Sequence, residues 1–506
     1  MKSKRPRIFC ILGSVALLAT ACAPAVPNNS GAPAVTLPPA LGKFQSPIGD
    51  EQRNAIETVL LYLPENGTGQ LKALPVSIAL PPNRHPAETA VQRLFSFSGN
   101  GSAAPLVTGG QLELFTGSSA EISGGTATIN LSAAALALDA QQLASVSRAI
   151  TNTLCQWQDI KFVNILVAGQ HPGIDIAATL PMGSLRSTAN EEPLWDIPAG
   201  EERFSSVATL YYPAPLGKGV LAEARAVTFS GRTLPEMATD LLTALSAAPV
   251  SLTNVPRIPS LEQLLASDIV VSDATTGGGR IVQLHFTQAA NEMFINAGIP
   301  RSVMMASLVL TLTTFMPNTS GISVQIGSEI ITALVPTGIF GAPGREILFE
   351  DGIMRRSQFS SFLLELSPIY FAGNEGSLTR VLRPLPYYQA HHARSLLAQM
   401  ILGPGASEAV LGLKRTLPGS ITDADLVGFA REGDTLLLNF SAAFLESCRG
   451  LTPEQEKLLI YSIVNGMCEM RGIRRVRFFI AGQQPETLSG SLYLPGEFLP
   501  QWEMLR

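Results

Sequence analysis

The hydrophobic and polar positions of the chain repeat at an interval of about 155 residues. Each repeat opens with β-branched and aromatic residues that end at or near a proline or glycine, in residues 58–64 and 208–213 and more loosely in 368–371. Such runs predict strands. After a second extended stretch, apolar residues follow at i, i+3, i+4 spacing, which predicts a short helix in each repeat.

A glycine turn that leads into a strand is the clearest repeated feature. It occupies residues 124–132, 278–287 and 433–441 and ends at Ser132, Thr287 and Ser441. From Ser132 to Thr287 there are 155 positions, and from Thr287 to Ser441 there are 154. A hydroxyl side chain at this place predicts a helix N-cap.

A long helix, a β-rich stretch and an extended tail complete each repeat. Thr452, Pro453 and Gln455 predict the start of that helix in the third repeat, as cap, first helical residue and capping-box partner. The order strand, strand, helix, strand, helix, strand predicts an α+β or α/β fold class: three tandem small two-layer domains, each a short sheet covered by two helices. We place them at 51–198 (first segment), 199–355 (middle segment, divergent) and 356–506 (third segment).

The N-terminus has a different composition. Basic residues precede an apolar run over 8–18, which is too short to span a bilayer, and small residues then precede Cys22. This pattern resembles a lipobox. It predicts a lipoprotein signal peptide over 1–21, lipidation of Cys22, and a proline-rich tether over 22–50. An ordinary secretory signal cleaved after Ala21 is the alternative.

The repeated motifs resemble the GerMN domain, the sporulation and spore-germination domain of bacterial envelope lipoproteins. They are residues 61–64, 130–132, 151–154, 163–169, 402–404, 417–419, 438–441 and 463–465. In the middle segment His285 replaces the asparagine of the motif, and Leu310 stands in place of Asn152 and Asn465. The resemblance implies small α/β domains that pack side by side in envelope assemblies, with no catalytic residues assigned.

Composition and motifs argue against catalysis and nucleic-acid binding. Charged residues make up 15% of the chain, the net charge is −5, and no basic stripe is visible. The sequence contains no Gly-x-Ser-x-Gly elbow, His-Glu-x-x-His, Cys-x-x-Cys or phosphate loop. We therefore predict no enzyme, and no catalytic, cofactor-binding or metal residues.

The histidines and asparagines are interpreted as structural. His85 and His171 each precede a proline and are read as turn residues, and His285 as a hydrogen-bonding residue at a strand end. Adjacent residues point in different directions on a helix, which disfavours the pair 391–392 as a metal site. Asn130 and Asn439 are expected to hydrogen-bond the backbone at a strand-to-helix corner, although a ligand-reading role stays open.

Buried side chains account for the other repeated residues. Cys155 and Cys468 occupy equivalent helix positions and are read as buried thiols. A bridge between Cys448 and Cys468 remains an alternative. The expected core residues at a further equivalent position are Trp157, Phe315 and Met470.

We expect a lipid-anchored scaffold or interaction protein on the extracytoplasmic face of the cell membrane, linked to sporulation or germination. Its expected partners are the membrane, through the N-terminal lipid, and envelope proteins or peptidoglycan, without cofactor. The alternative is a peptidoglycan-binding module, and a hydrolase with an unfamiliar site ranks third. The aromatic candidates for glycan contact are Trp195, Tyr387, Tyr388 and Trp502.

Overall fold

The computed structural model describes most of the chain after the predicted tether. The described residues are 55–80, 85–107, 112–115, 120–173, 180–195, 197–198, 200–274, 278–337 and 345–506. They all belong to one compact unit, Phe44–Arg506. The predicted signal peptide, Cys22 and the tether lie outside the described residues.

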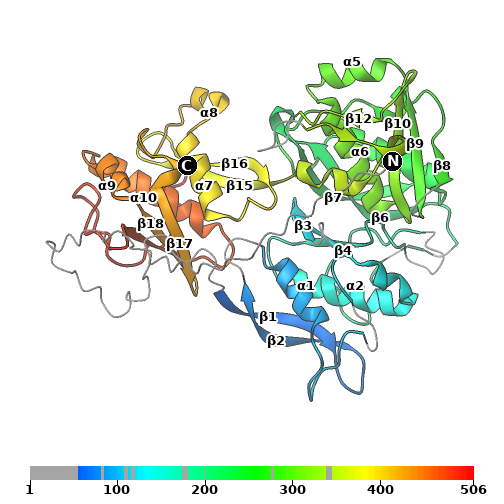
Figure 1. Ribbon diagram of the computed structural model, residues 1–506, viewed down its shortest axis with the longest axis horizontal. Helices are drawn as coiled ribbons and strands as arrows, with labels where there is room; N and C mark the ends of the chain where they lie inside the picture. The colour runs from blue at the N-terminus through cyan, green and yellow to red at the C-terminus, as the bar shows by residue number, and fades with distance from the viewer. Residues whose placement is uncertain are drawn as a thin grey trace, which may run out of the picture. The chain divides into compact units, whose positions relative to one another are not determined.

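Helices and strands alternate throughout the described chain, and one order of elements occurs three times (Figure 1). In the first segment the elements are β1 (Ala55–Pro64), β2 (Leu71–Leu80), α1 (Ala87–Phe95), β3 (Ala120–Ser123), β4 (Thr126–Leu131), η1 (Ala133–Ala137), α2 (Ala140–Leu154) and β5 (Phe162–Val167).

The middle segment repeats this order with additions. Its elements are β6 (Phe204–Pro213), η2 (Pro215–Gly217), β7 (Val220–Phe229), α3 (Leu234–Ser246), α4 (Leu261–Leu264), β8 (Val270–Asp273), β9 (Arg280–Phe286), α5 (Ala289–Asn296), α6 (Arg301–Phe315), β10 (Thr319–Ile326), β11 (Glu329–Ile330), β12 (Ala333–Leu334), β13 (Ile347–Leu348), η3 (Glu350–Gly352) and β14 (Ile353–Met354).

The third segment follows the same order again. Its elements are η4 (Arg356–Gln358), η5 (Ser360–Phe362), β15 (Leu363–Ala372), β16 (Leu378–Pro386), α7 (Ala393–Leu402), α8 (Ala406–Val410), η6 (Asp423–Asp425), β17 (Leu426–Glu432), β18 (Thr435–Phe440), α9 (Ala442–Cys448), α10 (Pro453–Cys468), β19 (Arg475–Ile480) and η7 (Trp502–Met504).

Each segment contains a small sheet with the same central topology. In β3-β4-β5, β8-β9-β10 and β17-β18-β19, the first pair is antiparallel and the second is parallel. The predicted order was wrong in lacking the first strand of each sheet. β3 and β8 have only four residues, too few for a period-two pattern to stand out in the sequence. β17 has seven residues, but Gly428, Phe429 and Ala430 are all buried, so it does not alternate either.

The two opening strands of each segment form a hairpin: β1–β2, β6–β7 and β15–β16 are all antiparallel. β7 also pairs in parallel with β15, through Val220–Leu363 and Leu221–Leu364. The hairpins of the middle and third segments therefore share one four-stranded sheet, in the order β16-β15-β7-β6.

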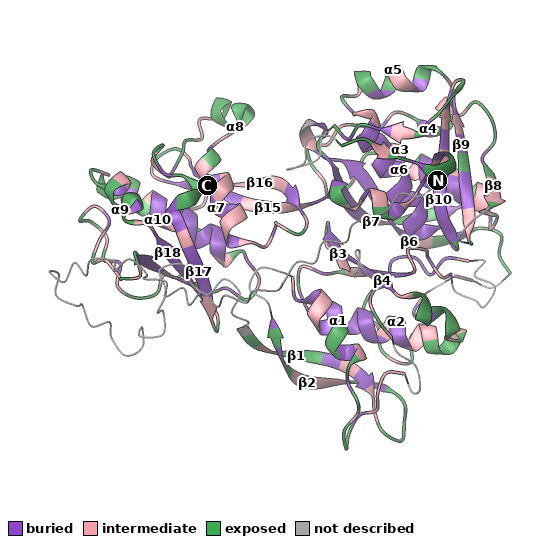
Figure 2. Ribbon diagram, in the orientation of Figure 1, coloured by how far each residue is buried: buried purple, intermediate pink, exposed green. Residues whose placement is uncertain are grey.

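Both faces of the first small sheet are covered. All six residues of β4 are buried (Figure 2). Ala127, Ile129 and Leu131 face the core of their own segment. On the other face, the Asn164 amide donates to Thr128 at 3.2 Å and to Thr209 of β6 at 3.0 Å. A polar network thus joins the first segment to the middle one, and its buried groups are satisfied.

The hydrophobic side chains gather in three main clusters. One contains residues of the first segment only and one residues of the third only. The cluster of the middle segment also takes in Phe359, Phe362 and Leu363, from the start of the third segment. Trp157, Phe315 and Met470 are all buried, which confirms them as core residues.

The helix starts agree in part with the predicted caps. Thr452 and Gln455 form the capping box of α10, as predicted. Ser441 caps α9, but the Ser132 side chain makes no cap bond and α5 begins after Gln288 rather than Thr287. The backbone at Ser132, Thr287 and Ser441 nevertheless makes an equivalent hydrogen bond in all three segments. The N–H groups of these residues donate to Glu113, Leu264 and Asp425, respectively, at 2.8, 2.8 and 2.9 Å.

The most apolar helix is buried throughout its length after the first residue: Ser302 to Phe315 of α6 are all buried. In the described chain, no single helix is long and apolar enough to cross a membrane; only the bent pair α5 and α6, at 101°, meets the criterion by length and composition.

A buried ion pair links all three segments. Arg356 Nη2 lies 2.5 Å from Glu121 Oε2 on β3, and the two side chains are 4% and 3% exposed. The same Nη2 donates to the Tyr211 hydroxyl of β6 at 3.3 Å. Ser360 donates to the other Glu121 oxygen at 2.7 Å. Two charges this deeply buried are tolerated because each has a partner of opposite charge and further hydrogen bonds.

Replacing Glu121 with Gln should therefore destabilise the protein by about 3 kcal/mol, because Arg356 keeps its buried charge without a counter-charge. The midpoint and slope of urea unfolding, followed by circular dichroism, measure the loss.

The matched control is Glu446→Gln, which removes an exposed pair with Arg449 at 2.8 Å. Exposed pairs contribute about 0–1 kcal/mol, so this variant should unfold close to the wild type. Equal effects of the two substitutions would contradict the role assigned to the buried pair.

Candidate functional site

The repeated asparagines hold the backbone, as predicted. The side-chain oxygen of Asn130 accepts from Gly169 N–H at 2.9 Å, and that of Asn439 accepts from Gly482 N–H at 2.8 Å. Both bonds join the end of one strand to the turn after the parallel neighbour strand. His285 lies at the equivalent place in the middle segment, with Nε2 3.1 Å from the Gly327 carbonyl. All three side chains therefore have structural hydrogen bonds.

A second pair of equivalent asparagines, Asn152 and Asn465, binds the extended tails of the first and third segments. Asn152 donates to the carbonyl of Thr188 at 3.0 Å and accepts from its N–H at 3.1 Å. Asn465 makes the same two bonds with Gln501, at 3.2 and 2.9 Å. Both asparagines lie on the long helix of their segment, so each long helix binds its own extended tail.

The first and third segments meet through equivalent loops. His85 and His391 each lie two residues before the first residue of a helix, Ala87 in α1 and Ala393 in α7. Their ring centroids are 5.3 Å apart at an interplanar angle of 66°. The sequence alone does not link the two histidines, whereas the structure brings their rings into contact. Their shared position before equivalent helices is the signal that could have found the pair.

Asp159, in the loop after α2, completes this cluster. Its Oδ2 lies 2.8 Å from His85 Nε2. His85 Nδ1 accepts from the Ala87 N–H at 3.1 Å, so the ring proton is on Nε2 and is donated to the carboxylate. Burial lowers the pKa of His85 and outweighs the nearby Asp159 charge. Burial alone would raise the pKa of Asp159, but the His85 hydrogen bond and the neighbouring cations lower it to about 2.

A buried cation of the third segment, Arg471, lies beside the two histidines. The Arg471 guanidinium lies 3.7 Å from the centroid of the Trp157 ring. Burial lowers the pKa of Arg471 to about 10, against the attraction of Asp159. Burial also lowers the pKa of His391, to about 4, and His85 adds to the effect. These shifts keep both imidazoles neutral at neutral pH.

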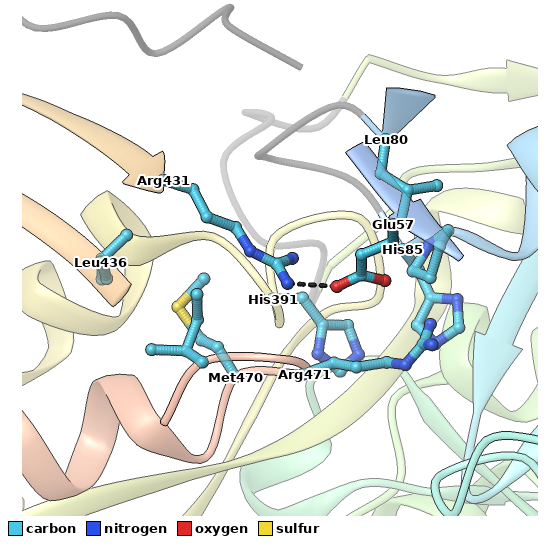
Figure 3. A pocket seen from close by; sticks show the side chains of 10 residues that line it. Glu57, Leu80, His85, His391, Arg431, Leu436, Met470 and Arg471 are labelled. Atoms are coloured by element: carbon cyan, nitrogen blue, oxygen red, sulfur yellow. Dashed lines mark hydrogen bonds and ion pairs between the residues drawn. The ribbon is translucent and has the colours of Figure 1, made fainter. Parts of the chain in front are cut away.

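An ion pair between a strand of the first segment and a strand of the third lies at the same contact between these segments. Glu57 of β1 pairs with Arg431 of β17, beside His391 and Arg471 (Figure 3). A cavity of about 30 Å³ lies among these four residues and His85. The cavity is also lined by apolar side chains, among them Leu80, Leu436 and Met470, so the charged groups of this nearly filled junction lie against apolar surface.

Glu365 of β15 extends the charged cluster into a second cavity. Together with Asp159 and His391 it lines a cavity of about 180 Å³. Its Oε2 accepts from the Gly124 N–H at 2.7 Å, in the β3–β4 turn. Burial raises the pKa of Glu365 to about 7, despite backbone N–H donors from Gly124 and Leu366.

The cluster is better suited to a proton than to a metal ion. In the described part of the chain, His85, Asp159 and His391 form the group whose ligand atoms come within 4.8 Å of one another. A metal on His85 Nε2 would force the ring proton onto Nδ1, directly against the Ala87 N–H. The buried Arg471 charge opposes a cation as well. We therefore interpret the group as a site of proton exchange.

Comparison with known families decides the identity of the two segments that build this junction. Residues 60–172 and 368–486 match the family model Germane, described as sporulation and spore germination. Both segments belong to the Germane family. The resemblance read from the sequence is confirmed for these residues, and the matched ranges contain His85, Asp159, His391 and Arg471.

Solved structures that match this chain include the tandem GerMN domains of the sporulation protein GerM from Bacillus subtilis. They are 19% identical, covering 55% of this chain and 94% of that chain, with a TM-score of 0.21. A putative lipoprotein from Clostridium perfringens is 22% identical, covering 24% of this chain and 81% of that chain, with a TM-score of 0.17. At such TM-scores the likeness carries no structural argument, so the family assignment rests on the sequence match. Among curated proteins, none matches the chain.

The aromatic candidates for glycan contact divide into two groups. Tyr388 is 55% and Trp502 46% exposed. Trp195 packs against the core of the first Germane segment, and Tyr387 packs partly against that of the middle segment. Only the exposed pair is therefore available to a ligand in the described structure.

The cysteines of the described chain are free. Cys155 and Cys468 are half-buried and Cys448 is buried, so the bridge left open between Cys448 and Cys468 is not formed. Burial raises the pKa of the Cys155 thiol to about 11, and those of Cys448 and Cys468 to about 12. Cys155 and Cys468, predicted as buried thiols, are thus only half-buried.

These thiols should react slowly with iodoacetamide at pH 8. The thiolate is the reactive form, and raised pKa values lower its fraction roughly 100-fold or more relative to an unperturbed thiol near ~8.5. Mass spectrometry of the three cysteine peptides, with urea-unfolded protein as the control, measures the rates. A native rate equal to the unfolded rate at any of the three would contradict the assignment.

Proposed function

We propose that this chain is a lipid-anchored scaffold of the cell envelope that works in sporulation or spore germination, on the extracytoplasmic face of the membrane. The observation that carries the proposal is the contact between the two Germane segments through equivalent loops, His85 against His391. Two family domains packed in this way offer their outer surfaces to one assembly as a single unit. Binding sites linked in one unit raise the effective concentration for a partner.

We also propose that the middle segment is a third, divergent domain of the same kind. The recurring order of elements supports this, as does the sheet topology β8-β9-β10, which repeats that of both Germane segments. Its hairpin shares a sheet with the third segment, which ties it into the same unit.

The proposed action is binding rather than catalysis. The polar residues that recur between the Germane segments, Asn130 with Asn439 and Asn152 with Asn465, hydrogen-bond the backbone of their own segment. Side chains used in this way support the fold instead of a reacting substrate.

Replacing Cys22 with Ser should move the protein out of the membrane fraction, because the acyl chains on that cysteine supply the anchoring energy, roughly 0.8 kcal/mol per buried methylene. Fractionation of cells that express the full chain, with metabolic labelling by an alkyne-bearing fatty acid, measures both effects.

Cys155→Ser is the matched control and should leave fractionation and labelling unchanged. Membrane retention of the Cys22→Ser variant would contradict the anchor. The scaffold role is tested separately: mild crosslinking of the wild type should recover an envelope protein, and failure to recover one would contradict that role.

Peptidoglycan binding is the second candidate, supported by the exposed rings of Tyr388 and Trp502. If it holds, purified cell wall should sediment the wild type, and Trp502→Ala should weaken binding by about tenfold, the effect of losing one exposed aromatic contact of roughly 1 kcal/mol or somewhat more. Trp195→Phe is the control, since that ring packs against the core. Failure of the wild type to sediment would dismiss this candidate.

A further inference from the structure

Four charged or titratable side chains converge where the first segment meets the third. His85 and Asp159 come from the first segment, and His391 and Arg471 from the third. His85 shares its Nε2 proton with Asp159 at 2.8 Å, and its ring lies against that of His391 at 5.3 Å. The contact therefore depends on two neutral imidazoles packed beside one carboxylate.

A further proton on either imidazole would add positive charge beside the guanidinium of Arg471, whose hydrogen-bond donors are only partly paired. Nη1 of Arg471 is buried and has no hydrogen-bond partner among the described residues. Asp159 is the carboxylate next to His85, and it already accepts the Nε2 proton of that ring. Protonation of His391 would place a cation against His85 and near Arg471, where burial leaves little water to screen the repulsion.

We propose that His85, Asp159 and His391 form a proton-operated latch: at neutral pH they hold the first segment against the third, and protonation of the two imidazoles releases that contact. The open state is the same chain with this junction solvated and each segment still folded. This inference goes beyond the scaffold role, because it makes the relative position of two binding surfaces depend on pH.

The direction of the pH effect follows from the protonation states. A solvated imidazole titrates near ~6.5, whereas burial lowers the pKa of His391 in the closed state to about 4. The stabilisation that neutral His391 gives the latch is thus fully present above pH ~6.5 and is lost progressively as the pH falls toward 4, because the imidazole of the open state binds protons more readily. Asp159, whose closed-state pKa is about 2, weakens the contact further only below its ordinary value of 3.8.

One neighbouring group titrates in the opposite sense. Glu365 has a pKa of about 7 in the closed state against an ordinary 4.5, so it favours closure as the pH falls between those values. Each net proton gained on opening changes the open-to-closed ratio ~10-fold per pH unit. On opening, His391 gains a proton where Glu365 loses one, and His85, whose pKa burial also lowers, adds further proton uptake, so a falling pH favours the open state. The other charged groups that face the cluster are Glu57, Arg431 and Arg471 at the smaller cavity and the ion pair of Arg380 with Glu469 at the larger one.

The emission of Trp157 reports on the latch, because its ring lies under Arg471 and 5.5 Å from the His85 ring. The experiment titrates the full chain in detergent from pH 7.5 to 4.5 and subtracts the emission of a Trp157→Phe variant. Far-UV circular dichroism recorded in parallel separates opening from unfolding. We expect a red shift of Trp157 emission below pH 6.5 with unchanged circular dichroism.

Three variants give distinct slopes. His391→Gln removes one group that takes up a proton on opening, so the open-to-closed ratio should change less steeply with pH than in the wild type, by up to ~10-fold per pH unit. Glu365→Gln removes the opposing group and should make the change steeper than in the wild type, by up to ~10-fold per pH unit. The double variant loses one group of each sign and should return to the wild-type slope. These slopes remain distinct even if one substitution shifts the midpoint.

His171→Gln is the matched control, because His171 is also buried, with its pKa lowered to about 3 by burial, but its carbonyl contacts Asn318 of the middle segment. That variant should keep the wild-type slope. The proposal is overturned if the wild type shows no red shift above pH 4.5, if His391→Gln keeps the wild-type slope, or if His171→Gln abolishes the response.

Discussion

The buried pair of Glu121 and Arg356 is the constraint on which the arrangement of the three segments depends. Glu121 lies on the first small sheet, Arg356 opens the third segment, and Tyr211 and Thr314 of the middle segment contact the same guanidinium. A buried charge without a partner is far costlier than one with a partner, so these groups must meet once the surrounding side chains exclude water. One side chain thereby ties the start of the third segment to the first and middle segments.

Polar contacts also make the other junctions of the first segment. The first sheet joins the middle segment through Asn164 and Thr209, and the first and third segments meet at His85, Asp159 and His391. The apolar clusters lie mainly inside individual segments. Apolar burial therefore folds each segment, whereas hydrogen bonds and ion pairs, which require specific geometry, select how the segments pack.

This division of roles connects the fold to the proposed function. A scaffold needs surfaces held at a defined spacing, and the junctions here are held by groups whose charge depends on protonation. The two Germane segments contact each other through the equivalent loops of His85 and His391. The loops after α2 and α10 add groups of opposite charge, Asp159 and Arg471. Divergence between repeated sequences has thus produced an attraction between their copies.

The sequence by itself determined the repeat, the family of two segments, the hairpins, the helices and most of the core, because apolar periodicity and turn residues act over a few neighbouring positions. It also identified the backbone bonds of Asn130 and Asn439 from their place at strand ends. It missed the first strand of each small sheet, because β3 and β8 are too short for a pattern and β17 does not alternate. Only the tertiary structure decided that β7 pairs with β15, that Arg356 reaches Glu121, and that His85 meets His391. These partners lie more than 100 residues apart, and their approach depends on how whole segments pack, which no local pattern encodes.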